Sequence, residues 1–258
     1  MSTVACVIIT KNEEANIQEC LGSVAWSDER IVVDAESRDR TTELANAAGA
    51  RVIVRPWPGF GPQKNYGIDL AAGEWILIVD ADERVPKPLH QEILARITAW
   101  KPGDPVAYEI PRKNYFYGAW VRYAGVYPDY QIRLFRRGCA WYNDVPVHEN
   151  LIVDGLIGRL STSLEHQTEK RIADHFRKFG LYTTLAAREK SGSVRGVRID
   201  DLVIRPLVVF VKTYVLKQGF RDGARGLIVS VFASMYTFVK YAKVWHMIQV
   251  TRGEAIER

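Results

Sequence analysis

The chain has 258 residues, of which 47% are apolar and 25% charged, and its formal net charge is +5. This composition excludes global disorder, and the length predicts one large domain or one domain with an appendage. The three cysteines are odd in number and widely spaced, which argues against a disulfide framework or a cysteine metal site and predicts reduced thiols in a cytosolic protein.

Four apolar runs predict a parallel sheet in the first 83 residues. The first, VACVIIT, has no basic leader or cleavage site, so it indicates a strand and not a signal peptide. Continuous runs of this kind fit strands covered on both faces, and segments with helical spacing separate them. This alternation predicts an α/β sheet with right-handed crossovers. The runs are VACVIIT (4–10), RIVVDAES (30–37), RVIVRP (51–56) and EWILIVDADE (74–83).

Polar residues follow three of these strands at the point where each strand ends. Ligands of such sheets bind outside the carboxyl ends of the strands, so the three clusters together predict a binding site. For any single cluster the alternative is a solvated turn with a helix cap. The residues are Thr10, Lys11, Asn12, Glu13, Asp34, Glu36, Asp80 and Asp82.

Asp80 and Asp82 lie one residue apart, directly after four apolar residues. Two carboxylates repel each other, and burying one without a partner is costly. Both could reach one divalent cation of the oxygen-preferring kind, held jointly with substrate phosphates. We therefore expect Mg²⁺ or Mn²⁺ on Asp82 and Asp80, acting as a Lewis acid at a phosphoryl group.

Residues 100–168 are rich in aromatic side chains, with short strand-like pieces and Gly and Pro turns. This pattern predicts an antiparallel excursion or lid, whose rings suit sugars or form ordinary core. A basic strand here carries Arg133, Arg136 and Arg137, which could contact a diphosphate or be solvated.

The C-terminal part is predicted to be helical, apolar and basic. From Lys170 to Arg258 the chain has 17 Lys and Arg against 7 Asp and Glu. The uninterrupted apolar stretch at 226–239 is too short to span a bilayer comfortably. We expect an in-plane membrane helix or hairpin, with a pair of core helices as the alternative. No nucleic-acid module is recognisable, so no nucleic-acid partner is expected.

Several motifs together resemble those of inverting family 2 glycosyltransferases with the GT-A fold, in particular the WaaE-like lipopolysaccharide-core β-glucosyltransferases. The resemblance implies a GT-A catalytic domain at 1–168, with a nucleotide-binding half (1–100) and an acceptor-side half (101–168). A helical membrane-surface region would follow at 169–258. The motifs are IITKNEEANI, IVVDAESRDRT, GPQKNYGIDLAAGEWILIVDADER and VHENL.

The resemblance also implies roles for the matching residues. The turn after the first strand would border the nucleotide base, Asp34 would hydrogen-bond to the base, and Lys64 would lie near the nucleotide. Asp80 would lie near the ribose and Asp82 would bind the metal. DAES stands where many relatives have D-x-G-S, and Glu36 is expected to stiffen that turn. The expected cofactor-binding set is Thr10, Asn12, Glu13, Asp34, Lys64, Asp80, Ala81 and Asp82.

Inversion needs a carboxylate that takes a proton from the acceptor hydroxyl. The family carries this base well downstream of D-x-D, which indicates Glu149, with Asp129 and Asp144 as alternatives. Glu149 could instead be a surface carboxylate paired with an arginine. His148 could orient it, and His166 could reach the metal or a phosphate or be structural.

The resulting hypothesis is an inverting, metal-dependent transferase that moves glucose from UDP-glucose to a lipid-linked saccharide, as in the lipopolysaccharide inner core. It would work at the cytoplasmic face of the membrane. Another nucleotide-sugar transferase of the cell envelope is the first alternative. A nucleotidyltransferase is disfavoured because the turn TKNEE is acidic and lacks glycine. A non-catalytic sugar-nucleotide-binding scaffold is the last alternative.

Overall fold

The structure is a computed structural model that describes residues 2–143, 150–169, 172–194, 196–251 and 253. The chain divides into two compact units. The first comprises Met1–Lys113 and Asp129–Gln167, and the second comprises Asn114–Pro128 and Thr168–Arg258.

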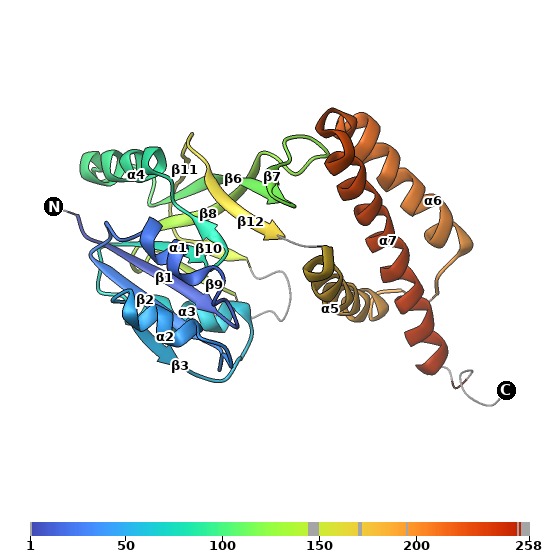
Figure 1. Cartoon of the computed structure of the whole chain (residues 1–258), viewed down its shortest axis with the longest axis horizontal. Helices are drawn as coiled ribbons and strands as arrows, with labels where there is room; N and C mark the ends of the chain where they lie inside the picture. The colour runs from blue at the N-terminus through green and yellow to red at the C-terminus, as the bar shows by residue number, and fades with distance from the viewer. Residues whose placement is uncertain (1, 144–149, 170–171, 195, 252, 254–258) are drawn as a thin grey trace. The chain divides into compact units, whose positions relative to one another are not determined.

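The first unit is built on a mixed sheet with the strand order β3-β2-β1-β4-β8-β6-β12-β5 (Figure 1). The pairs among the first four strands are parallel, whereas β8 runs antiparallel to both β4 and β6, and β12 runs antiparallel to β5. The parallel strands are β1 (Val4–Thr10), β2 (Glu29–Asp34), β3 (Arg51–Val54) and β4 (Trp75–Asp80). The others are β5 (Glu83–Arg84), β6 (Ala107–Phe116), β8 (Asp129–Arg136) and β12 (Leu164–Glu169).

Three short strands complete this part of the structure. The strand β11 (Ile157–Arg159) adds to β6, whereas β9 (Ala140–Tyr142) and β10 (Leu151–Val153) form a separate antiparallel pair.

Helices cover both faces of the parallel strands, which explains why those strands are apolar throughout. On one face α1 (Ile17–Ser23), α2 (Thr41–Ala47) and α4 (Lys87–Ala99) pack against alternate residues of β1 and β4. On the other face α3 (Phe60–Leu70) and the β9–β10 pair cover the remaining residues of those strands. The predicted α/β class, with a mostly parallel sheet flanked by helices, is confirmed.

The close approach of α3 to the sheet depends on Gly67. A Cβ atom at this position would lie 2.4 Å from Val7 Cγ1 and 3.1 Å from a methyl of Val33. We expect Gly67→Ala to lower the free energy of unfolding by about 1–3 kcal/mol, because the tight core must shift. Gly22→Ala is the matched helical control, since nothing lies within 4 Å of the added Cβ. Thermal or urea unfolding that shows equal stability for both variants would contradict this packing.

The parallel register brings the polar strand ends together at one edge of the sheet. Thr10 lies beside Asp34 in the β1–β2 pair, and Ile9 lies beside Asp80 in the β1–β4 pair. The polar clusters that are far apart in the sequence are therefore neighbours.

The second unit is helical. Its helices are α5 (Ile172–Ser191), α6 (Ile199–Phe210), η1 (Val211–Leu216), η2 (Gly219–Asp222) and α7 (Gly223–Thr251). It also contains the loop with β7 (Ala119–Trp120). The backbone N–H of Ala124 donates to the Lys217 carbonyl at 3.0 Å, and that of Tyr123 donates to Asp222 at 2.7 Å. This loop is therefore fixed to the turn between α6 and α7.

Many large apolar side chains of α6, η1 and α7 are exposed, among them Val203, Leu207 and Leu216. Within the described residues one helical stretch, Gly219–Val250, is long and apolar enough to cross a membrane by length and composition. These helices are a candidate membrane-associating extension.

Candidate active site

The turns after β1 and β2 are joined by hydrogen bonds. Asp34 is completely buried, and its carboxylate accepts hydrogen bonds from the Thr10 hydroxyl at 2.8 Å and from the Ser37 backbone N–H at 2.8 Å. The Ser37 hydroxyl donates to it as well. Asp34 thus holds together the two turns at the predicted base site. The sequence analysis did not identify Ser37 as its partner.

Asn12 and Glu13 bridge the same two turns. The Arg38 backbone N–H donates to the Asn12 side chain at 2.8 Å, and the Glu13 backbone N–H donates to the Thr41 hydroxyl at 2.7 Å. Asn12 and Glu36 both have a φ of 55°. That left-handed conformation suits Asn and strains Glu, so a glycine at the position of Glu36 would adopt it without strain.

Asp80, at the end of β4, is paired with two cations. It binds the guanidinium of Arg133, a side chain with 5% exposure, and lies 3.8 Å from the ammonium of Lys64. Burial raises the pKa of Asp80, but Arg133 and Lys64 outweigh it and hold that pKa well below the usual range. Asp80 is therefore ionised and already compensated by protein side chains.

Asp82 lies two residues further on, next to a histidine from β12. Its Oδ2 is 3.5 Å from Nε2 of His166, and both side chains are about one-sixth exposed, at 16% and 15%. Burial lowers the pKa of His166, but the hydrogen bond and the charge of Asp82 outweigh it and raise the pKa. The β5–β12 pairing, in which His166 lies opposite Glu83, creates this contact.

The donor set at Asp82 fits a divalent cation that shares its coordination with a substrate. In the part of the chain that the structure describes, no three His, Cys, Asp or Glu side chains are grouped to hold a metal. The Asp82 carboxylate would leave most positions to phosphate oxygens and water, as is usual for Mg²⁺ and compatible with Mn²⁺, whereas the imidazole of His166 is a softer donor that Mg²⁺ binds less readily. Ala81, between the two aspartates, is buried, and its carbonyl accepts a hydrogen bond from Arg84.

A second layer of charges surrounds Asp80. Glu83 is completely buried and binds both Arg112, at 3.3 Å, and Arg133, at 2.6 Å. Arg112 also binds Asp129 at 2.5 Å. The only sequence feature that could have indicated a role for Glu83 is its position directly after Asp82, in the stretch DADE. No sequence feature indicated a role for Arg112, because its contacts depend on the antiparallel pairing of β6 with β8.

Asp80, Arg112 and Arg133 line an open cleft of about 440 Å³. Its walls come from α3, β4, β6, β8 and β9, together with the residues that begin β10. The lining residues are Lys64, Asp80, Glu109, Arg112, Tyr130, Gln131, Ile132, Arg133, Tyr142, Asn150 and Leu151.

The predicted base Glu149, its neighbour His148 and the alternative Asp144 lie outside the described residues. Asn150, which follows Glu149 in the sequence, lines the cleft. The other alternative, Asp129, is held by Arg112 and accepts a further hydrogen bond from Gln131.

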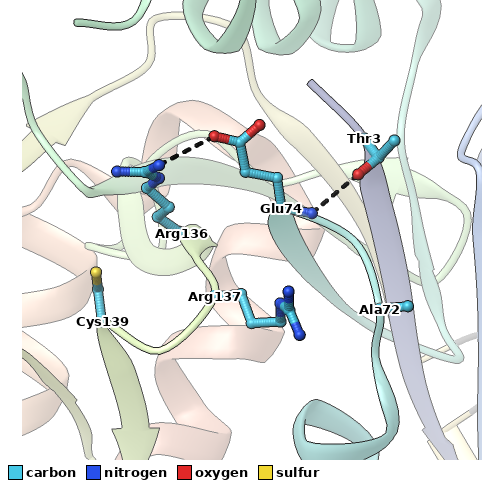
Figure 2. Close-up of a pocket in the computed structure, with 6 residues that line it drawn as sticks. All are labelled: Thr3, Ala72, Glu74, Arg136, Arg137 and Cys139. Carbon is cyan, nitrogen blue, oxygen red and sulfur yellow. Dashed lines mark hydrogen bonds and ion pairs between the residues drawn. The ribbon is translucent and has the colours of Figure 1, made fainter. Parts of the chain in front are cut away.

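The arginines of the basic strand β8 contact two different parts of the first unit. Arg133 reaches Asp80, whereas Arg136 pairs with Glu74 at 3.2 Å, beside the start of β4. Arg136 and Arg137 line a separate cavity together with Thr3, Ala72, Glu74 and Cys139 (Figure 2). Its volume is about 350 Å³. Arg136 lies opposite Trp75, at the amino end of β4, so this cavity is away from the acidic pair.

Comparison with known proteins identifies the family to which the chain belongs. A family model described as "Glycosyl transferase family 2" matches residues 5–142. The chain belongs to glycosyl transferase family 2. This region includes every predicted nucleotide-site residue from Thr10 to Asp82, the predicted Arg133, and the newly found Glu83 and Arg112.

Relatives extend the likeness over most of the chain. The lipopolysaccharide core biosynthesis glycosyltransferase LpsC of Rhizobium meliloti (strain 1021) is 29% identical over 249 residues, covering 94% of this chain and 92% of LpsC. An uncharacterised glycosyltransferase of Rickettsia typhi is 27% identical, covering 95% of this chain and 87% of its own length. The predicted family and the predicted enzyme class, glycosyltransferase, are confirmed.

Among solved structures, a Mycobacterium tuberculosis glucosyl-3-phosphoglycerate synthase in complex with Mg²⁺ and UDP is similar over 44% of this chain and 43% of that chain. Its sequence identity is 27% and the TM-score is 0.35.

Proposed function

We propose that this family 2 glycosyltransferase moves a hexose, with inversion, from a UDP-sugar such as UDP-glucose to a lipid-linked saccharide acceptor. The observation that carries the proposal is the convergence of Asp34, Asp80, Asp82 and Lys64 at the carboxyl edge of the sheet. Ligands of open α/β sheets bind at such an edge.

The residues at this edge of the sheet are proposed to bind different parts of the donor. Asp34, held by Thr10 and Ser37, is proposed to accept a hydrogen bond from the base. Asp80 is proposed to bind the ribose, and its ion pairs with Arg133 and Lys64 orient its side chain. Asp82 and His166 would hold Mg²⁺ or Mn²⁺, which supplies Lewis-acid stabilisation of the departing diphosphate. Because Asp80 is already compensated, we assign it a smaller share in metal binding than Asp82.

Glu149 is proposed as the general base. Inverting transfer needs a carboxylate that removes the proton of the acceptor hydroxyl as that oxygen attacks the anomeric carbon. The neighbouring Asn150 lines the cleft, and Asp129 is engaged by Arg112, which favours Glu149 over Asp129.

A transfer assay tests this function directly. The protein is incubated with UDP-glucose, Mn²⁺ and lipopolysaccharide truncated in its inner core, and both UDP release and label transfer are measured. We expect acceptor-dependent UDP release and a β-linked product by NMR. UDP release without labelled acceptor, or no UDP release with any UDP-hexose, would contradict the proposal.

The acceptor is proposed to be part of a membrane lipid, and the enzyme to lie on the cytoplasmic face of the membrane. LpsC is a lipopolysaccharide core biosynthesis enzyme by name, and lipopolysaccharide is acylated. The exposed apolar residues of α6 and α7 suit a bilayer surface, and the neighbouring Lys and Arg suit anionic headgroups.

The double variant Val203→Glu and Leu207→Glu tests the membrane surface. Both side chains are 56% exposed on α6, so the fold should be unaffected. We expect most binding to phosphatidylglycerol vesicles to be lost in a sedimentation assay, because apolar area is replaced by charge that anionic lipid repels. Gln91→Glu with Ala95→Glu adds the same charge to exposed positions of α4 and should leave vesicle binding unchanged. Equal binding by both double variants would refute the assigned surface.

A further inference from the structure

Glu83 is a completely buried carboxylate that pairs with two arginines of the cleft, Arg112 and Arg133. Its side chain has no exposed surface, and a buried carboxylate is stable only when its oxygens are paired. Its oxygens accept hydrogen bonds from the Asp80 backbone N–H at 2.9 Å, from Arg133 at 2.6 Å and from Arg112 at 3.3 Å.

Each of these bonds fixes a different part of the site. The bond to the Asp80 N–H closes the turn after β4 and so sets the direction of the acidic pair. The other two bonds hold the guanidinium groups of Arg112 and Arg133 close together, although two like charges would otherwise repel. Arg133 then reaches Asp80, and Arg112 reaches Asp129.

The charge of Arg133 is secured by the same arrangement. Burial lowers the pKa of Arg133, but the charges of Asp80 and Glu83 outweigh it and raise the pKa well above the usual value. Its Nε atom is buried without a hydrogen-bond partner, whereas its Nη2 atom donates to both carboxylates, Asp80 and Glu83.

We propose that Glu83 is a positioning residue for the nucleotide-sugar: it aims Arg133 and Arg112 at the cleft and holds Asp80 in place for the donor. The inference rests on the proposed function, because the ligand it serves is the UDP moiety. Glu83 does not touch the donor itself and acts through the two arginines.

Glu83→Gln removes the charge and keeps the shape. We expect kcat/KM for the UDP-sugar to fall about 100-fold, the cost of a small misplacement of binding groups. UDP affinity, measured by calorimetry without metal and again with Mn²⁺, should fall in both conditions. Glu83→Asp keeps the charge and should recover part of the UDP affinity.

Glu92→Gln is the matched control. Glu92 also accepts hydrogen bonds, from Ser161 and Thr162, and it lies outside the cleft. We expect this variant to lose some thermal stability but to keep the UDP affinity and kcat/KM of the wild type. If Glu83→Gln behaves like Glu92→Gln in all three measurements, the proposal is wrong.

A double-mutant cycle separates positioning from general stability. Because Glu83 acts through its arginines, the effect of Glu83→Gln on UDP affinity should shrink in an Arg112→Gln background, and additive effects would overturn the proposal. If Glu83→Gln does not fold, Glu83→Asp takes its place in the cycle. Wild-type protein that binds no UDP would overturn the proposed function together with this inference, whereas wild-type binding with an unaffected Glu83→Gln would overturn this inference alone.

Discussion

Asp82→Asn is expected to reduce kcat by about a thousandfold in the UDP-sugar transfer assay. The substitution keeps the shape of the side chain and removes the charge that would hold the cation. Lewis-acid stabilisation is worth several kcal/mol, and each step of about 1.4 kcal/mol changes the rate tenfold. The variant should also lose the increase in UDP affinity that Mn²⁺ produces, measured by calorimetry.

Asp69→Asn is the control for Asp82→Asn. Asp69 is an exposed carboxylate on α3, and its loss should change neither kcat nor the effect of Mn²⁺. An Asp82→Asn enzyme that is stimulated by Mn²⁺ like the wild type would show that the metal site has been placed wrongly.

Glu149→Gln is expected to lower kcat by about 10²–10⁴-fold, the usual contribution of a general base. The UDP affinity should stay at the wild-type value, because the base acts on the acceptor hydroxyl and not on the nucleotide. Calorimetry with UDP and single-turnover transfer to the acceptor measure the two effects separately.

The alternative bases provide the comparison. Asp144→Asn should retain most activity. Asp129→Asn should weaken donor binding through Arg112 and lower kcat less than Glu149→Gln does. If either aspartate variant loses more kcat than Glu149→Gln, the base has been assigned to the wrong residue.

The parallel half of the fold could be predicted from the sequence because its signal is local. Strands buried on both faces are apolar throughout, so β1, β2 and β4 stand out in the sequence. Their polar ends converge by the geometry of parallel sheets. The approach of Asp34 and Asp80 to one edge was therefore expected from the sequence, whereas only the family resemblance indicated that Lys64 lies near the nucleotide.

The contacts that His166 and Arg133 make with the acidic pair could not be predicted, because they depend on antiparallel pairing between distant segments. His166 meets Asp82 only because β12 pairs with β5, and Arg133 meets Asp80 only because β8 runs beside β4. The same register carries Arg136 to the amino end of β4. No local pattern fixes a strand's direction, so the arginines of β8 looked equivalent in the sequence.

The central claim is that the UDP moiety binds at the carboxyl edge of β1, β2 and β4, with its diphosphate beside Asp82. A crystal structure of the protein soaked with UDP and Mn²⁺ tests it most directly. We expect an anomalous manganese peak at Asp82 and His166, the diphosphate against that ion, and the base against Asp34. A manganese ion or a diphosphate bound instead in the cavity of Arg136 and Arg137, with no nucleotide near Asp82, would contradict it.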